Sequence, residues 1–365
     1  MFIATDYLTD NCVLLRTEML GAARGEIVFF PTLCGSTPDA DSLDIPIHAW
    51  SFEHNDSKAT HFLLRLAAKA LGCEKSELSD PSIYWKRASL FVARQAKSAG
   101  AVVRVGERLL PLKFSSMDGH SWAKLTISRG ELEKITAENS LGERTLTIQA
   151  WSGGLLARSH RVHTKLLAPA GISVISDIDD TIKLSHVHDK RELLANTFTR
   201  SFKPIPGMAA LYQEWRQQGA SFHYVSSTPW QLYGPLEEFM TSHNFPSGTF
   251  HLKSFGWRGL SWTNLFKSPL RTKPKTIEPI LKSFPQRRFV LVGDAGEKDP
   301  EIYGELARKY SSQIAKVFIR LPESFDENPS RFSRAFRDFD SAKWMAFRSA
   351  SELPSRLECA ENISK

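Results

Sequence analysis

Cysteine is scarce and scattered in this chain. The four cysteines among the 365 residues lie far apart, at Cys12, Cys34, Cys73 and Cys359. Their spacing contains no metal-type pair, which argues against a zinc ribbon and against a disulfide framework. The protein is therefore expected in a reducing compartment.

Long apolar runs are absent too. No stretch approaches the roughly 18 apolar residues that a membrane-spanning helix requires. Near the N-terminus, Asp6 and Asp10 fall where a secretory signal would need an uninterrupted apolar segment. We therefore predict a cytoplasmic protein that has no transmembrane segment and is either soluble or peripherally attached to a membrane.

Strong charge bias, internal repeats and low-complexity tracts are likewise missing. The 47 Lys and Arg residues against 40 Asp and Glu residues give a net charge of +7, spread over the chain without a basic tail. Such a surface favours anionic partners, among them membranes, phosphorylated substrates and nucleic acids, without choosing between them. A solvated basic surface with no partner explains the same charge.

The texture of the sequence changes near residues 165–171, which predicts two domains. Residues 1–167 are predicted to form a β-rich N-terminal domain, sandwich- or barrel-like, with one helix at 58–73. Strands are expected at 25–34, 44–53, 87–95, 101–106, 120–129, 144–151 and 160–167. This half contains no catalytic constellation, and it leaves its own role and the oligomeric state open.

Residues 168–350 alternate between strand and helix patterns, and residues 351–365 are expected to form a C-terminal tail. Strands are predicted at 171–176, 221–226, 288–293, 316–321 and 343–349, and helices at 207–219, 230–244, 276–284 and 300–310. This alternation is typical of an α/β fold with a Rossmann-like, doubly wound parallel sheet. Ligands of such folds bind beyond the carboxyl ends of the strands.

The stretch VISDIDDTIK places three aspartates directly after an apolar run. Asp177, Asp179 and Asp180 repel one another. Burying any of these charges without a positive partner costs free energy. Asp294 and Asp299 follow the third predicted strand. Carboxylates that meet at one sheet edge favour a bound hard cation, and we predict Mg²⁺ because it prefers oxygen ligands.

The order of these motifs resembles that of the haloacid dehalogenase superfamily of phosphotransferases. It consists of D-x-D-x-T after one strand, Ser after a second, a later Lys, and G-D-x-x-x-x-D after another strand. More narrowly, ISDIDDTIK, PIPGMAALYQEW, HYVSSTPWQLY, FPSGTFHLK and FVLVGDAGEKDPEIY are similar to the catalytic domain of the actin-patch-protein-type phosphatidate phosphatases. The resemblance covers roughly residues 168–322 and implies a haloacid dehalogenase-like catalytic domain.

The resemblance also implies catalytic roles. Asp177 would be the nucleophile, which forms an aspartyl-phosphate. Asp179 would be the general acid that protonates the departing alcohol and then activates water. Ser226 would bind a phosphoryl oxygen, and its neighbour Ser227 is the alternative for this role.

The remaining roles concern charge and metal binding. Lys273, preferred over Lys275 on the family's spacing, would offset charge on the phosphate and the nucleophile. The implied metal ligands are Asp177, Asp179 through its main-chain carbonyl, Asp294 and Asp299, of which Asp299 would position the metal shell or Lys273. The implied phosphate-binding residues are Thr181, Ser226, Ser227 and Lys273. Asp180 is assigned no catalytic role.

The residues predict a phosphoric monoester hydrolase, and the resemblance adds the substrate. Phosphatidate would be hydrolysed to diacylglycerol and phosphate with Mg²⁺ as the cofactor, and no nucleic acid partner is expected. Two alternatives stay open. One is a phosphatase for a soluble ester such as a sugar phosphate or nucleotide, and the other is a membrane or cytoskeletal adaptor with a vestigial phosphatase site.

Two aromatic and basic stretches bear on membrane contact. Residues 253–271 interleave tryptophans with Lys and Arg, which suits either a headgroup interface or a cap over the site. Residues 330–340 place phenylalanines on one helical face, and burial of this face against the sheet is favoured over an interfacial helix. The segment from His186 to Asp189 is interpreted as a mobile flap rather than a zinc site.

Overall fold

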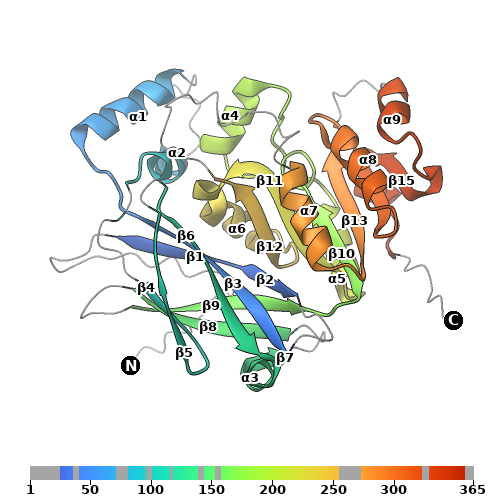
Figure 1. Ribbon diagram of the computed structural model, residues 1–365. Helices are drawn as coiled ribbons and strands as arrows, with labels where there is room; N and C mark the ends of the chain where they lie inside the picture. Colours follow the sequence, from blue (N-terminus) through green and yellow to red (C-terminus); the bar gives the residue numbers. More distant parts are fainter. Residues whose placement is uncertain are drawn as a thin grey trace, which may run out of the picture. The chain divides into compact units, whose positions relative to one another are not determined.

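The computed structural model describes most of the chain. The described residues are 25–35, 41–70, 81–94, 96, 101–115, 118–138, 144–152, 158–254, 273–322 and 329–357. The chain divides into two compact units, Met1–Glu53 with Arg94–Leu167 and His54–Ala93 with Ala168–Lys365, whose elements are labelled in Figure 1. Residues 54–93, which the sequence assigns to the N-terminal domain, thus belong to the second unit.

The first unit consists of two β-sheets. One is antiparallel, in the order β1 (Glu26–Phe30), β3 (Ser42–Phe52) and β6 (His120–Ser128). The other has the order β2-β9-β8-β4-β5, with β7 paired to β8. Its strands are β2 (Thr32–Gly35), β4 (Ala101–Val105), β5 (Arg108–Leu112), β7 (Thr136–Glu138), β8 (Arg144–Ser152) and β9 (Arg158–Leu167).

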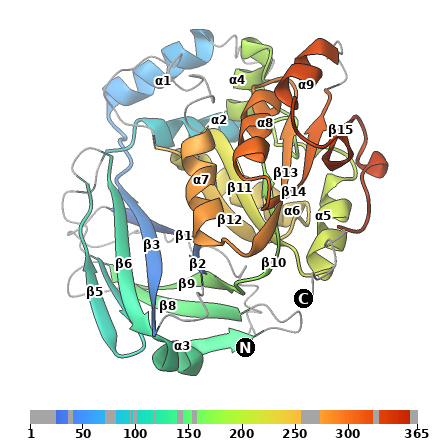
Figure 2. The same ribbon diagram turned by 45° about the vertical axis from the view of Figure 1, so that its right-hand side comes forward.

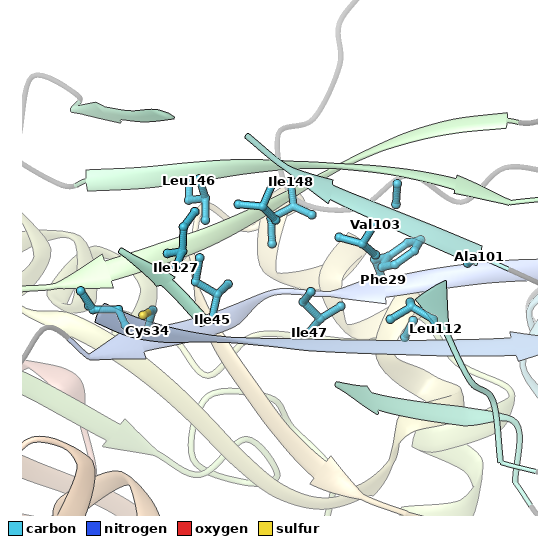
Figure 3. Packing of buried hydrophobic residues seen from close by; sticks show 14 of the residues in the cluster. Phe29, Cys34, Ile45, Ile47, Ala101, Val103, Leu112, Ile127, Leu146 and Ile148 are labelled. Atoms are coloured by element: carbon cyan, nitrogen blue, oxygen red, sulfur yellow. The ribbon is translucent and has the colours of Figure 1, made fainter. Parts of the chain in front are cut away.

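The facing sides of these two sheets enclose one apolar core, drawn in Figure 3. Alternate residues of β3, such as Ile45 and Ile47, point into it because side chains of a strand alternate between its two faces. From the opposite sheet, Val103 of β4 and Ile148 of β8 meet them, and these four side chains are at most 3% exposed. The unit is therefore a sandwich, one of the two architectures expected from the sequence.

Two local predictions for this half are wrong. Residues 87–95 form no strand, because helix α2 (Pro81–Ala88) and a 3₁₀ turn at Ser89–Phe91 occupy most of this stretch. The helix predicted at 58–73 does form, as α1 (Lys58–Ala70), but it belongs to the second unit, and the helix in the described part of the first unit is α3 (Arg129–Ile135). Its start has a sequence signal, since Ser128 and Glu131 form a capping box in which each side chain accepts the other's backbone N–H.

A buried histidine pair links β3 and β6 on the side of the sheet away from this core. His48 and His120 are both 2% exposed, and His48 Nε2 lies 3.0 Å from His120 Nδ1, a hydrogen-bonding distance. The His120 ring also lies parallel to that of Trp50. Burial lowers the pKa of His120 to about 4, with Asp118 opposing this shift weakly, so the ring is neutral in the folded protein near pH 7.

We expect the first unit to lose stability as pH falls from 6.5 to about 4. Unfolded His120 takes up a proton near its ordinary pKa of 6.5, whereas the folded form resists protonation down to about 4. Acid therefore favours unfolding by up to about 3 kcal/mol. His120→Gln, which keeps a hydrogen-bonding side chain without titrating, should flatten this dependence in urea unfolding.

The control for this measurement is His61→Gln, at an exposed histidine. It should keep the pH slope of the wild type. An unchanged slope in His120→Gln would show that this buried ring is not its source.

The second unit is built on a six-stranded sheet in which the paired strands are all parallel. The order is β12 (Gly248–Lys253), β11 (Ser221–Pro229), β10 (Gly171–Ser176), β13 (Arg287–Asp294), β14 (Ile314–Arg320) and β15 (Trp344–Phe347). From β10 the chain builds outward to β12 on one side, and from β13 it builds outward to β15 on the other. The strand order therefore reverses between β10 and β13, which is where parallel α/β sheets bind ligands.

Helices cover both faces of this sheet. They are α4 (Lys190–Phe198), α5 (Met208–Gln217), α6 (Tyr233–Ser242), α7 (Lys273–Ser283), α8 (Asp299–Lys309) and α9 (Pro329–Ala335). Figures 1 and 2 show α7 and α8 side by side over one face. On the other face Trp215 of α5 stacks on Phe318 of β14, and Tyr212 Oη lies 2.8 Å from Ser176 Oγ.

Residues 54–93 contribute α1 (Lys58–Ala70) and α2 to this unit. Leu64 of α1, Tyr84 of α2 and Phe198 of α4 share a buried apolar cluster. Arg87 of α2 donates to the main-chain carbonyls of Thr197 and Arg200, both at 2.8 Å. These contacts explain why a segment that precedes β4 in the chain packs with the second unit.

The start of the predicted C-terminal tail is packed. Leu353 and Leu357 are buried, and Trp215 Nε1 donates to Pro354 O at 2.9 Å. Residues up to 357 thus belong to the second unit, and the remainder of the tail lies outside the described residues.

Across the described parts of the chain, none of the helices combines the length and the apolar character that a membrane crossing needs.

Arg287 fixes the entry of the chain into the sheet. Its guanidinium, 3% exposed, donates to Ala168 O at 2.8 Å, Ala170 O at 2.9 Å and Ile172 O at 2.6 Å. It also donates to Ser173 Oγ at 2.9 Å. Burial lowers the pKa of Arg287 to about 10, which keeps it charged near neutral pH.

We expect Arg287→Met to lower the free energy of unfolding by about 3 kcal/mol, because it removes a buried guanidinium with four hydrogen bonds and leaves the buried carbonyl of Ile172 without this donor. Arg288→Met is the matched control. Its half-buried side chain bonds Ser312 O, and its loss should cost under about 1 kcal/mol. Equal losses in the two variants, measured by urea unfolding, would contradict this role of Arg287.

Candidate active site

The chain turns sharply after β10, at the reversal of the strand order. Asp177 N donates to Val292 O of β13 at 2.8 Å, which extends the ladder one residue beyond the strand. Asp180 then takes the left-handed conformation, with φ at 54°, which Asp tolerates better than most residues. Its N–H donates to Lys183 O at 2.7 Å, so the turn returns Lys183 to the side of Asp179.

Asp180 holds the loop that follows this turn. Its carboxylate accepts the N–H groups of Ser185, His186 and Val187 at 2.7 to 2.9 Å. Its carbonyl oxygen accepts from the Arg320 guanidinium at 2.7 Å. Both carboxylate oxygens of Asp180 are thus engaged by backbone donors.

Asp179 is enclosed by hydrogen-bond donors. Asp179 Oδ1 lies 2.8 Å from Lys183 Nζ and accepts from Ser185 Oγ at 2.7 Å. Asp179 Oδ2 accepts from Ser226 Oγ and from Thr228 Oγ1 of β11, both at 2.9 Å. The loop after β10 and the end of β11 therefore meet at this carboxylate.

Two opposing effects act on the acidity of Asp179. Burial by itself would raise its pKa, because a charged group is less stable away from water. The charge of Lys183, its hydrogen bond and those of Ser185 and Thr228 outweigh burial and hold the pKa of Asp179 well below its ordinary value. Asp179 is therefore a firmly ionised carboxylate in this conformation.

Lys273, the first residue of α7, is the central cation of the site. Its Nζ lies 2.9 Å from Asp177 Oδ1, 3.1 Å from Glu297 Oε2 and 2.5 Å from Asp299 Oδ1. A lysine at a helix N-terminus opposes the helix dipole, so these carboxylates supply its stabilisation. Burial lowers the pKa of Lys273, but the carboxylates outweigh it and raise this pKa well above its ordinary value.

Asp294 and Asp299 approach Asp177 from the end of β13. Asp294 Oδ1 accepts the N–H groups of Gly296 and Glu297 at 2.5 and 3.2 Å. A Cβ on Gly293 would lie 2.3 Å from Asp299 Oδ2, so only glycine lets α8 bring Asp299 this close to the strand. One oxygen each from Asp177, Asp294 and Asp299 falls within 4.8 Å of the others.

This cluster carries more negative than positive charge. Three carboxylates, from Asp177, Glu297 and Asp299, contact the ammonium of Lys273, and a fourth, from Asp294, lies close to those of Asp177 and Asp299. Burial raises the pKa of Asp177 and of Asp294 well above the ordinary value, and the neighbouring carboxylates add to it, whereas Lys273 opposes it. The site is thus electrostatically unsatisfied as a protein-only cluster.

One oxygen of this cluster is left without a hydrogen-bond partner. Asp294 Oδ2 is buried and has no hydrogen-bond partner among the described residues. A buried carboxylate oxygen without a donor is costly unless a positive ion compensates for it. The donor set is made of oxygens alone, which suits a hard cation such as Mg²⁺.

Most residues singled out from the sequence meet here. Thr181 Oγ1 lies 3.3 Å from Asp177 Oδ2, and Ser226 reaches Asp179. Ser227, the alternative to Ser226, has a buried Oγ with no hydrogen-bond partner in the described part of the chain. Lys275 is exposed, so only Lys273 of the two candidate lysines joins the cluster.

Sequence reasoning missed four participants. They are Lys183, Ser185 and Thr228 around Asp179, and Glu297 beside Lys273. Lys183 follows Asp179 at i+4, and an acid and a base at this spacing are a readable signal for a pair. The other three follow from the path of the loops, for which the sequence contains no comparable signal.

The two aromatic stretches have different outcomes. Residues 255–271, most of the predicted cap or membrane contact at 253–271, lie outside the described residues. In the second stretch Phe332 and Phe336 are buried and stack on Trp344 of β15. The favoured interpretation, burial of this aromatic face, is confirmed.

The second unit is thus a parallel α/β domain. A cluster of carboxylates lies where its strand order reverses, between β10 and β13. Residues 172–321 match the family model described as "Phosphatidate phosphatase APP1, catalytic domain". The resemblance of this segment to the catalytic domain of the phosphatidate phosphatases, inferred from the motifs, is therefore confirmed.

Two curated relatives match about half of this chain. The chain is 36% identical over 169 residues to phosphatidate phosphatase APP1 of Saccharomyces cerevisiae, covering 45% of this chain. It is 30% identical over 192 residues to an uncharacterized protein of Schizosaccharomyces pombe, covering 51% of this chain. A solved structure from Thermotoga maritima, provisionally assigned as a beta-phosphoglucomutase, aligns over 50% of this chain and 96% of its own at 12% identity with a TM-score of 0.30, too low to support a shared fold.

The matched region is a small part of the curated relatives. It spans 28% of the Saccharomyces cerevisiae protein and 31% of the Schizosaccharomyces pombe protein.

We expect Asp294→Asn to stabilise the chelator-treated protein by about 3 °C in melting temperature, because it removes one uncompensated buried charge. Adding Mg²⁺ should raise the melting temperature of the wild type and leave that of Asp294→Asn nearly unchanged. Thermal unfolding with and without Mg²⁺ measures both effects. Asp338→Asn, at an exposed carboxylate, is the control that should behave as the wild type.

The stability advantage of Asp294→Asn over the wild type should change with pH in a defined direction. The pKa of Asp294 is raised above its ordinary 3.8 in the metal-free fold, so its destabilising charge is fully present above the raised value and lost as pH falls toward 3.8. The advantage of Asp294→Asn should therefore shrink as the pH is lowered from 7. An advantage that grows with acid would contradict the buried-charge account.

Proposed function

We propose that this chain is an Mg²⁺-dependent phosphatidate phosphatase of the haloacid dehalogenase type, which releases diacylglycerol and phosphate through an aspartyl-phosphate. One observation carries the proposal. Asp177 is buried at the switch point, 2.9 Å from the Lys273 ammonium and inside a cluster of carboxylates, within the segment that matches the APP1 catalytic domain.

Mg²⁺ would be held by Asp177, Asp294 and Asp299, with the Asp179 main-chain carbonyl as a further ligand. When bound, Mg²⁺ would neutralise the carboxylate cluster and screen the charge of the substrate phosphate. The orphaned Asp294 Oδ2 supports this assignment. Asp299 has a second role in the proposal, since its contact with Lys273 fixes that ammonium beside the nucleophile.

In the first half-reaction an Asp177 oxygen would attack the phosphorus of the ester. The bond between phosphorus and the alcohol oxygen breaks, and the alcohol takes a proton from Asp179 as it leaves. Lys273 would hold the charge on Asp177 and on the phosphoryl oxygens. Ser226 and Thr181 would bind those oxygens, and Ser227, whose Oγ has no hydrogen-bond partner among the described residues, is a further candidate donor.

In the second half-reaction Asp179 would take a proton from water as the water attacks the aspartyl-phosphate. Phosphate leaves, and Asp177 is regenerated. Asp179 is ionised at this stage because it has given its proton to the alcohol, so it can accept the proton of the water. For the first step Asp179 must carry a proton, so the substrate has to displace its bonds to Lys183 and Ser226.

The choice of phosphatidate as substrate is supported by the matching proteins, whereas the proposed reaction is supported by the geometry of the site. Phosphatidate is the substrate printed in the names of the matching family and of the Saccharomyces cerevisiae relative. We propose the same substrate for this chain, which would then act as a cytoplasmic protein at the surface of a membrane.

The test is phosphate release from phosphatidate in detergent micelles, with and without Mg²⁺, beside a panel of soluble phosphate esters. Release should require Mg²⁺ and be confined to phosphatidate. Asp177→Asn should lose at least about 10³-fold in turnover, since it removes the nucleophile. Asp338→Asn, a matched change at an exposed site, should keep the wild-type rate.

Each other outcome rejects a defined part of the proposal. Release from soluble esters alone would keep the reaction and reject the lipid. Full turnover by Asp177→Asn would reject the nucleophile. A well-folded protein that releases no phosphate from any ester would reject the enzyme and favour the adaptor.

A further inference from the structure

Helix α1 exposes a stripe of large apolar side chains. Phe62 is 61% exposed, Leu63 52% and Leu66 48%. Among the described residues of the second unit, these three are the large hydrophobic side chains that stand out in solvent. Scattered single exposures are ordinary on a protein surface, whereas three on one helix turn form a patch that calls for a partner.

The opposite side of α1 is firmly attached to the unit. Leu64 is 2% exposed and lies in the buried cluster with Tyr84, whose hydroxyl donates to Leu64 O at 2.6 Å. At the N-terminus of the helix, Ser57 Oγ accepts the N–H of Thr60 at 3.2 Å. The helix is thus already docked by one face, and the exposed stripe is a second apolar face rather than a core face left open.

Basic residues line the exposed stripe. Lys58, Arg65 and Lys69 are exposed and follow one another at intervals of seven and four residues, which places them in one row along the helix. The helix KATHFLLRLAAKA contains no Asp or Glu. An apolar stripe beside a purely basic row is the pattern of a helix that lies in the interface of an anionic membrane.

The surroundings of α1 connect it with the site. Its cluster includes Phe198 of α4 and Leu232, which follow the carboxyl ends of β10 and β11 respectively. These are the strand ends that place Asp177 and Ser226 in the site. Figures 1 and 2 both show α1 next to α4. The exposed stripe therefore belongs to the end of the second unit that holds the carboxylate cluster.

We propose that α1 docks the second unit on an anionic membrane surface. Phe62, Leu63 and Leu66 enter the boundary between headgroups and acyl chains, and the basic row faces the lipid phosphates. Where the inference extends to turnover it rests on the proposed function, because docking by α1 brings the site to the surface that carries phosphatidate.

Vesicle flotation tests the docking without any substrate present. Wild type should bind phosphatidylcholine vesicles that contain phosphatidylserine and bind pure phosphatidylcholine far less. The variant Leu63→Gln/Leu66→Gln should lose at least about tenfold in partitioning. Lys58→Gln/Arg65→Gln/Lys69→Gln should also weaken binding, by on the order of fivefold per charge at low salt, and flatten its salt dependence.

Leu109→Gln is the matched control, because Leu109 is a leucine 63% exposed on β5 of the other unit. It should bind as the wild type does. Binding by Leu63→Gln/Leu66→Gln that equals the wild type, or a wild type that ignores anionic vesicles, would overturn the proposal. If wild type is instead a dimer by light scattering and this variant a monomer, the stripe covers a second copy and the proposal fails.

Turnover separates this inference from the proposed function. Leu63→Gln/Leu66→Gln should hydrolyse phosphatidate in detergent micelles at the wild-type rate and phosphatidate in vesicles at least about tenfold more slowly. Equal loss on both would assign these leucines to the fold or to the site and overturn docking. Vesicle binding that depends on α1, in a protein that hydrolyses nothing, would sustain the docking helix and reject the phosphatase.

Discussion

An excess of buried negative charge is the constraint on which the rest of the second unit depends. Four carboxylates converge where the strand order reverses, and the one ammonium of Lys273 cannot balance them. Such a cluster lowers the stability of the fold unless a bound cation or the protonation of a carboxylate reduces its charge. The orphaned oxygen of Asp294 marks the side from which the cation would approach. Stability and function are therefore opposed at this site, as is common where a protein holds groups ready for catalysis.

Much of the surrounding architecture serves to hold this cluster together. Arg287 fixes the start of β10 through main-chain carbonyls, while Gly293 allows α8 to approach β13 closely enough to place Asp299. Asp180 uses its whole carboxylate to secure the loop beside Asp179. These residues touch no reacting group in the proposal, and each acts through the backbone that it positions.

The sequence predicted the parallel sheet and the convergence of the main candidate residues for a clear physical reason. Asp177, Asp294 and Asp299 follow apolar runs, and the carboxyl ends of parallel strands meet at one edge whatever the loops do. Predictions that depended on tertiary packing were partly wrong. Residues 87–95 have the composition of a strand but lie in α2 and its following turn, and residues 54–93 pack with a unit that resumes only at Ala168. Ser185, Thr228 and Glu297 were missed because loop paths, rather than patterns, bring them to the site.

The proposed mechanism requires that Asp177 receives the phosphoryl group from the substrate. The most direct measurement is mass spectrometry of the protein quenched in acid during turnover of phosphatidate with Mg²⁺. A phosphoryl adduct on the peptide that contains Asp177, absent from Asp177→Asn and lost when substrate is exhausted, is the predicted result. Rapid turnover with no adduct on that peptide, or with an adduct on another residue, would contradict the covalent mechanism.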